Sequence, residues 1–192
     1  YKAICQVRSI LDILVSSYFS AGFIHNSKKD FSAERKLIIN GDLSIFDYSM
    51  YLLEGKGKFG RRPILDKYVS LKEMRKYVSV ENILIVRYED MVVNSERWAD
   101  QINSFINIKS VNIKKIILKT LPKYKKPAPQ EFVKDPVSYM SNYDGKHIRS
   151  PWPGDYKNYF RENEIVKIIK FISDYGIDID SEGNINKNFF TN

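Results

Sequence analysis

Three short segments carry charged and hydroxyl side chains at spacings that could hold an anion. In the first, Arg8 and Ser9 precede a helical pattern that places Asp12 and Ser16, four residues apart, on one face. A helix N-terminus offers unpaired N–H groups and partial positive charge, so Arg8, Ser16 and the helix end could together hold a phosphate. Alternatively, Ser9 and Asp12 form a capping box and Arg8 pairs with Asp12 in an ordinary capped helix.

The second and third segments place aromatic and charged residues after a strand and within a loop. Residues 83–90 end an apolar strand with a tyrosine and two carboxylates, at the edge where open α/β sheets bind ligands. Tyr88 could flank a base or pack beneath the next helix. Residues 147–160 form a basic, aromatic stretch in which Arg149 is the natural anion contact, unless this is a surface loop with buried aromatics.

Together and in this order, the three segments resemble the motifs of sulfotransferases that use 3′-phosphoadenosine 5′-phosphosulfate (PAPS). Arg8, Asp12 and Ser16 are similar to that family's Arg…Asp…Ser motif for the 3′-phosphate of the cofactor. Residues 87–90 resemble its Tyr-Glu-Asp/Glu motif, whose tyrosine lies near the adenine. Residues 149–160 resemble its second motif for the 3′-phosphate.

The resemblance extends over roughly residues 4–175 and implies a P-loop NTPase-like α/β fold, with a parallel sheet flanked by helices. It also implies which residues contact PAPS, namely Arg8, Ser16, Tyr88, Arg149 and Ser150. Three positions depart from the family pattern. Ser150 and Pro151 stand where the family has Lys and Gly, and Tyr156 replaces the usual Trp.

The family's loop for the 5′-phosphosulfate and its usual catalytic base belong upstream of Arg8. We therefore expect the N-terminal part of the fold to be missing from this chain, and we assign no catalytic residue. The two histidines, His25 and His147, are expected in surface or loop positions.

The implied reaction is transfer of a sulfuryl group from PAPS to a hydroxyl or amine of a small molecule or glycan. One alternative is a non-catalytic nucleotide-binding module, which the residues Ser150 and Pro151 would support. A second is a basic nucleic-acid-binding domain, suggested by the lysine-rich residues 114–126. The order of the three motifs favours the sulfotransferase and makes a nucleic acid an unexpected partner.

Composition sets further bounds on the protein class. The net charge of +8 over 192 residues favours an anionic ligand. The single cysteine, Cys5, excludes an internal disulfide and favours the cytoplasm, and no apolar run approaches the roughly 20 residues that span a bilayer. Residues 178–183 resemble the start of a calcium-binding loop, but its twelfth position is Phe189, so we expect a polar turn and no metal.

The elements that must position these motifs alternate between strands and helices. Residues 3–7 and 83–86 read as short buried strands, a helical pattern starts at Ile10, and a polar loop is expected over residues 26–42. Further helices are expected over residues 43–53, along a stripe through Leu71, Met74 and Val78, after a cap at Ser95, over residues 111–121, and over residues 165–175 up to Gly176.

This alternation predicts a parallel sheet with crossover helices. The length predicts one partial sulfotransferase-like domain over residues 1–192, with a polar tail from about residue 177.

Overall fold

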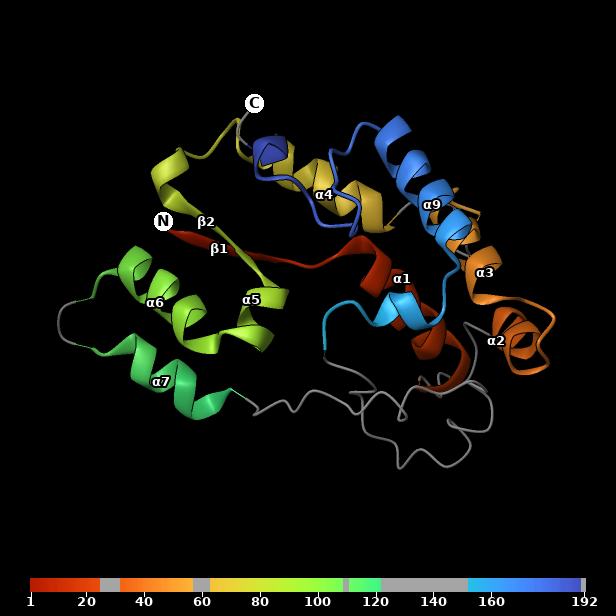
Figure 1. Ribbon diagram of the computed structural model, residues 1–192. Helices are drawn as coiled ribbons and strands as arrows, with labels where there is room; N and C mark the ends of the chain where they lie inside the picture. Colours follow the sequence, from red (N-terminus) through yellow and green to blue (C-terminus); the bar gives the residue numbers. More distant parts are fainter. Residues whose placement is uncertain (25–31, 57–62, 109–110, 122–151, 191–192) are drawn as a thin grey trace.

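The fold is built around two parallel strands that cross the middle of the molecule (Figure 1). The computed structural model describes residues 1–24, 32–56, 63–108, 111–121 and 152–190. Strand β1 (Ala3–Val7) pairs with β2 (Ile83–Arg87), in a register that runs from Ala3 opposite Ile83 to Val7 opposite Arg87. Both predicted strands and their parallel pairing are confirmed.

Helix α1 (Ile10–Phe19) follows β1 directly and forms the centre of the main core. Its apolar residues surround most of its circumference, and Ile10, Leu11, Leu14 and Val15 are fully buried. The helix leads into a π-helical segment, η1 (Ser20–Ile24). Because α1 is buried on several sides, the buried polar side chains of Ser9 and Asp12 at its start must find partners inside the protein.

Two helices cover the far end of α1. Helix α3 (Ile45–Leu53) begins two residues later than predicted, with Ser44 accepting a hydrogen bond from the Asp47 amide at 3.1 Å. Helix α2 (Ser32–Ile39) lies within residues 26–42, where we expected a loop. Its Ile38 is fully buried against Gly22, and this single apolar contact was hidden by the polar composition of the segment.

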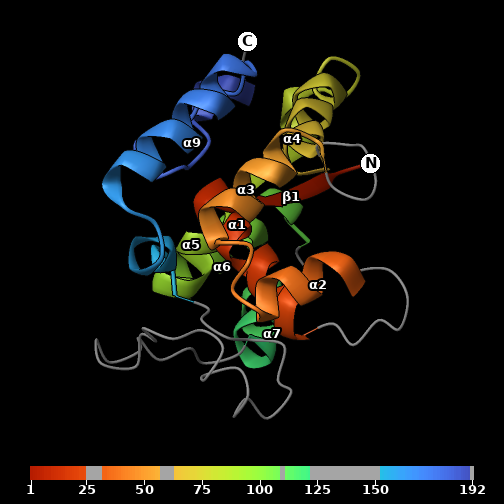
Figure 2. The same ribbon diagram turned by 90° about the vertical axis from the view of Figure 1, so that its right-hand side faces the viewer.

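Different helices cover the two faces of the strand pair, as both Figure 1 and Figure 2 show. On one side lies α4 (Pro63–Met74), which ends before Val78, so the predicted stripe is shorter than expected. A short 3₁₀ turn, η2 (Val80–Asn82), then leads into β2. On the other side, α6 (Ser95–Ile106) buries Trp98 and Ile102 against Val86.

The remaining helices of that second side are α5 (Tyr88–Val93) and α7 (Ile113–Thr120). Helix α6 was predicted to start from a cap at Ser95. Its cap is Asn94, whose side chain accepts a hydrogen bond from the Arg97 amide at 3.1 Å. The predicted helix over residues 111–121 is confirmed, with slightly narrower bounds.

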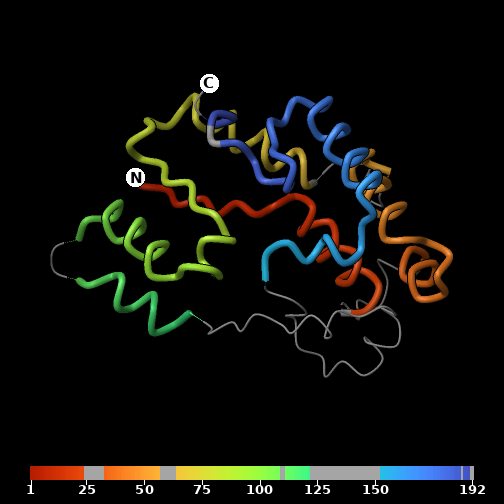
Figure 3. Tube along the Cα trace, viewed as in Figure 1, coloured from red at the N-terminus to blue at the C-terminus, as the bar shows by residue number. Residues whose placement is uncertain are grey.

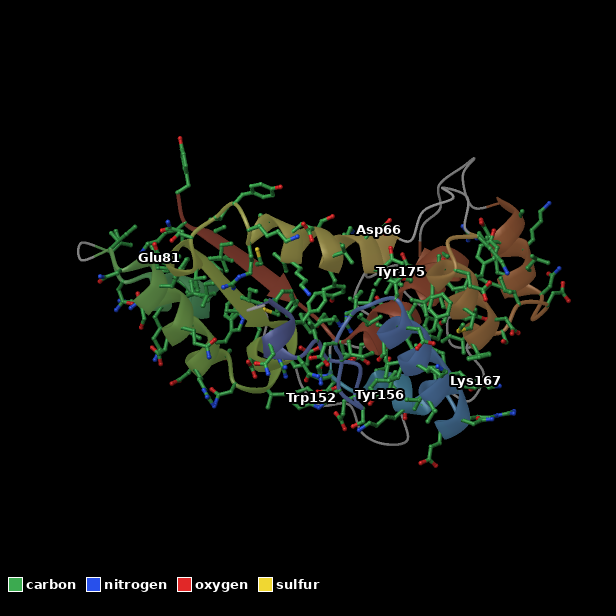
Figure 4. All side chains as sticks on the ribbon, turned by 90° about the horizontal axis from the view of Figure 1, so that it is seen from above. Asp66, Glu81, Trp152, Tyr156, Lys167 and Tyr175 are labelled. Carbon is green, nitrogen blue, oxygen red and sulfur yellow. The ribbon has the colours of Figure 1, made fainter. Side chains whose placement is uncertain are left out.

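The C-terminal part returns to the main core. A 3₁₀ turn, η4 (Asp155–Asn158), precedes α9 (Glu162–Asp174), which ends before Gly176 in a left-handed conformation, with φ +92°. The Tyr175 hydroxyl donates to Asp66 of α4 at 2.9 Å, and Figure 4 shows the two side chains next to each other. None of the helices in the described ranges is both long and apolar enough to cross a membrane.

The segment after α9 differs from the polar tail that we expected. Residues 177–190, which include the 3₁₀ turn η5 (Lys187–Phe190), place five apolar side chains in the core. These buried residues are Ile177, Ile179, Ile185, Phe189 and Phe190. They are separated by Asp, Asn and Gly residues, which make the segment polar in composition although its apolar side chains point inward.

Candidate functional site

Arg8 lies immediately after β1, and both its backbone carbonyl and its backbone amide contact the hydroxyl of one tyrosine. Tyr68 of α4 donates its hydroxyl proton to the Arg8 carbonyl at 2.6 Å, and the Arg8 amide lies 3.4 Å from the same hydroxyl oxygen. Burial raises the pKa of Tyr68 to about 12, so the hydroxyl keeps its proton and remains a donor. The start of α1 is therefore anchored to α4 at this residue.

The Arg8 side chain stacks on the aromatic residue that opens α5. The guanidinium carbon lies 4.5 Å from the centroid of the Tyr88 ring, within cation–π distance. The Nε atom of Arg8 is buried and has no hydrogen-bond partner among the described residues. The structure thus brings together two of the predicted site residues, Arg8 and Tyr88, one from the end of each strand. The Nε atom of Arg8 is left as a buried cationic donor.

Asp12 connects the first segment to the third. Its buried carboxylate accepts hydrogen bonds from the amides of Gly154, at 2.9 Å, and Tyr156, at 3.1 Å. Burial raises the pKa of Asp12, against the opposing effect of these two hydrogen bonds and of Arg8. Within the described part of the chain no ion pair joins Arg8 to Asp12, so the alternative of an Arg8–Asp12 pair in a capped helix is wrong.

The expected capping box is also wrong. The Ser9 side chain makes no cap to α1 and instead donates to the carbonyl of Glu182 at 2.9 Å. The local sequence pattern of Ser9 and Asp12 satisfied the rule, but both side chains bond to residues more than a hundred positions away.

The N-terminus of α1 is less open to an anion than we expected. The Ser9 amide donates to a carboxylate oxygen of Glu89 at 2.8 Å, and the Ile10 amide donates to the Gly183 carbonyl at 2.9 Å. Burial raises the pKa of Glu89, although the Ser9 amide and Arg8 oppose this shift. These two amides are therefore already used by protein acceptors.

Ser16 lies four residues beyond Asp12 on α1, roughly 6 Å further along the helix axis. Its side chain is exposed, whereas that of Asp12 is buried. The exposed hydroxyl can reach a ligand that lies over the helix. Arg149 and Ser150, as well as both histidines, lie outside the described residues.

The third segment is described from Trp152 onward, and its turn is shaped for the Asp12 contact. Gly154 adopts φ +82°, a conformation that other residues rarely take, and this turns the two amides toward Asp12. Tyr156, at the position where the family has Trp, is buried in the main core. Asp155 is also buried and accepts a hydrogen bond from the Asn158 side chain at 3.3 Å.

Sequence reasoning missed three contributors to this region. Tyr68 holds the Arg8 backbone, Glu89 holds the Ser9 amide, and residues 182–185 contact the first two segments. Glu89 belongs to a recognised motif, so its pairing could have been suspected. Nothing in the local spacing of Tyr68 or of residues 182–185 points to these contacts. In the described ranges no group of three metal-ligating side chains occurs.

A parallel strand pair with crossover helices, and charged residues gathered at the carboxyl ends of the strands, is the arrangement of an open α/β fold. The sulfotransferase domain family matches residues 1–176, and the chain belongs to this family. The resemblance seen in the motifs is therefore confirmed. A comparison with curated proteins gives no match.

One solved structure with this fold is mouse sulfotransferase SULT7A1 complexed with PAP. The match has a TM-score of 0.56 at 17% sequence identity, and it covers 94% of this chain and 60% of the mouse chain. It confirms the predicted P-loop-like α/β fold. The present chain accordingly spans 60% of the length of that sulfotransferase.

Proposed function

We propose that this chain is the part of a PAPS-dependent sulfotransferase that grips the 3′-phosphoadenosine end of the cofactor. The observation that carries the proposal is the Arg8 guanidinium, stacked at 4.5 Å on Tyr88, with a buried Nε that has no hydrogen-bond partner among the described residues. A buried cationic donor without a partner is costly, and a phosphate oxygen would satisfy both its charge and its hydrogen bond.

In this proposal each candidate residue has a separate task. Arg8 binds the 3′-phosphate, Ser16 donates to it from the exposed side of α1, and Tyr88 flanks the adenine while orienting the guanidinium. Arg149 and Ser150 complete the phosphate contacts, as the family resemblance implies. Asp12 contacts no ligand and instead ties the loop that follows these two residues to α1 through the Gly154 and Tyr156 amides.

When bound, PAPS supplies an activated sulfuryl group. In the overall reaction a bond forms between sulfur and the acceptor oxygen or nitrogen, the bond from sulfur to the 5′-phosphate breaks, and the acceptor loses a proton. The residues of this chain bind PAPS and orient it, which lowers the entropic part of the activation barrier for sulfuryl transfer. We assign neither the base that receives the proton nor the donors that stabilise the 5′-phosphate to any residue here.

The acceptor in this proposal is a small molecule or glycan. Because the chain spans 60% of the length of the mouse sulfotransferase, we also propose that a further part of the same enzyme completes the fold. A cytoplasmic location is supported by the single cysteine in 192 residues. We also propose that residues 1–192 act as one domain, because the buried residues after position 176 share the core of α1.

Titration calorimetry with adenosine 3′,5′-bisphosphate and with AMP tests the proposal. The two ligands differ only in the 3′-phosphate, so we expect the bisphosphate to bind at least tenfold more tightly, the effect of about one charge-assisted contact. Equal affinities would remove the basis for the assignment. Tight binding without sulfuryl transfer, once the upstream part is restored, would support a non-catalytic nucleotide-binding module.

A further inference from the structure

The segment that follows the family match contacts both halves of the candidate site. The family match ends at residue 176. Beyond it, the C-terminal turn, which we define as residues 180–185, returns alongside the junction between β1 and α1 (Figure 3). Three of its backbone carbonyls accept hydrogen bonds from the first and second motif segments.

The first two contacts hold the residues that follow Arg8. The Glu182 carbonyl accepts from the Ser9 hydroxyl at 2.9 Å, and the Gly183 carbonyl accepts from the Ile10 amide at 2.9 Å. Ser9 and Ile10 are both buried. The direction in which the chain leaves Arg8 is thus fixed by the C-terminal turn.

The third contact holds the residue that precedes Tyr88. Arg87 donates from Nη2 to the Ile185 carbonyl at 3.1 Å. Because Arg87 ends β2 and Tyr88 begins α5, this bond fixes the point from which the tyrosine ring projects. The same turn therefore holds the neighbours of both members of the Arg8–Tyr88 stack.

The turn is itself well defined. The Asp180 carboxylate accepts hydrogen bonds from the amides of Glu182 and Asn184, both at 2.9 Å, and Ile179 bridges to Ile185 in antiparallel fashion. Gly183 adopts φ +72°, and a Cβ atom there would lie 2.6 Å from Leu11 Cγ. Only glycine allows the turn to approach α1 this closely.

We propose that the C-terminal turn is a positioning element that sets the geometry of the Arg8–Tyr88 stack and thereby the selectivity for a 3′-phosphate. The proposal rests on the proposed function. It adds that residues outside the matched domain control how well the nucleotide is recognised, although none of them touches it.

Two pairs of variants in the 192-residue chain test the proposal, with the ratio of AMP to adenosine 3′,5′-bisphosphate dissociation constants as the readout. Arg87→Met removes the bond to Ile185, and Arg75→Met is its control. Arg75 lines the same pocket as Arg87 and Ile185 and carries the same charge as Arg87. Among the described residues, however, Arg75 makes no hydrogen bond to the C-terminal turn. Gly183→Ala displaces the turn, and Gly41→Ala, with φ +78° and open space around it, is the control.

We expect Arg87→Met and Gly183→Ala each to lower the ratio about threefold to tenfold, the effect of losing one hydrogen bond. Both controls should keep the wild-type ratio, and Arg87→Lys should restore part of it. A lowered ratio in Arg87→Met alone would mean that Arg87 contacts the nucleotide directly, which would overturn the proposal. Unchanged ratios in both variants, with only lower thermal stability, would reduce the turn to a structural role.

Amide hydrogen exchange gives a readout that does not depend on the nucleotide. Because the Ile10 amide donates to Gly183, its exchange should be at least about tenfold faster in Gly183→Ala than in Gly41→Ala. If the wild-type ratio of the dissociation constants for AMP and adenosine 3′,5′-bisphosphate were near one, the proposed function would be contradicted. Unchanged exchange at Ile10 would contradict the positioning role of the turn, whatever the ratio.

Discussion

The carboxylate of Asp12 accepts a hydrogen bond from the amide of Tyr156, 144 positions later in the chain, at 3.1 Å. A second bond, from the Gly154 amide, makes Asp12 the acceptor for two donors of the same turn. This arrangement links α1 to the loop region that the family uses for phosphate contacts. It also explains how an acidic residue can lie beside a proposed anion site, since its lone pairs face protein amides.

We expect Asp12→Asn to destabilise the fold by about 1 to 3 kcal/mol, because one of the two amides that donate to Asp12 would then face the N–H₂ group of asparagine. Urea unfolding of wild type and variant measures this difference. Asp100→Asn is a matched control, since Asp100 is an exposed partner of Lys114 and should cost at most about 1 kcal/mol. Equal losses in the two variants would contradict a special role for Asp12.

We expect Arg8→Ala to weaken binding of adenosine 3′,5′-bisphosphate by about 1.5 to 3 kcal/mol, the usual size of a hydrogen bond to a charged group. The fold should survive, because Tyr68 holds the Arg8 backbone rather than its side chain. Calorimetry measures the affinity and thermal denaturation measures the stability. Arg97→Ala, an exposed change on α6, should leave both unchanged, and a collapse of stability in Arg8→Ala would identify Arg8 as a structural residue.

The Glu89 carboxylate should make stability depend on pH in a defined direction. Its pKa is raised by burial, so the folded protein holds this proton more tightly than the unfolded chain does. The contribution of Glu89 to the free energy of unfolding is then fully present at low pH and is lost as the pH rises through the raised pKa, from about pH 4 upward.

Glu89→Gln keeps an acceptor for the Ser9 amide but removes this titration. We therefore expect wild type to lose stability relative to Glu89→Gln as the pH rises from about 4 to 8. Urea unfolding at a series of pH values follows the difference. An opposite slope would show that the partners of Glu89 lower its pKa more than burial raises it.

Gly22→Ala should destabilise the contact between η1 and α2. An added Cβ would lie 2.5 Å from Ile38 Cγ2, and Ile38 is fully buried, so the packing must shift at a cost of about 1 to 3 kcal/mol. Combining Gly22→Ala with Ile38→Ala removes the Cγ2 atom that the new Cβ would meet, so the loss in the double variant should be smaller than the sum of the two single losses. A loss smaller than this sum, measured by urea unfolding, confirms the cause, and additive losses would contradict it.

The sequence predicted those parts of the fold that local patterns specify. The apolar runs of β1 and β2, the spacing of Trp98 and Ile102, and the glycine after α9 each follow from short-range rules, and the structure confirms them. Helix α2 was missed because one residue, Ile38, accounts for its burial within a polar stretch.

The partners of the polar side chains were much less predictable than the helices and strands. Ser9 and Asp12 fit a capping box by spacing, yet the buried end of α1 offers each of them a distant partner that is better placed. No local rule contains the positions of Glu182 or Gly154. The stacking of Arg8 on Tyr88 has the same origin, since it depends on the pairing of two strands 80 residues apart.

The contacts between Ser9 and Glu182 and between Ile10 and Gly183 also bear on how the protein is made. They join residues 173 positions apart, so the start of α1 cannot reach these native partners until residues 182 and 183 have been synthesised and have left the ribosome. Parallel strand pairing adds contacts of long sequence separation, which slow folding. We therefore expect the native contacts of α1 to form late in folding, with the apolar α1 exposed to chaperones until residues 182 and 183 reach it.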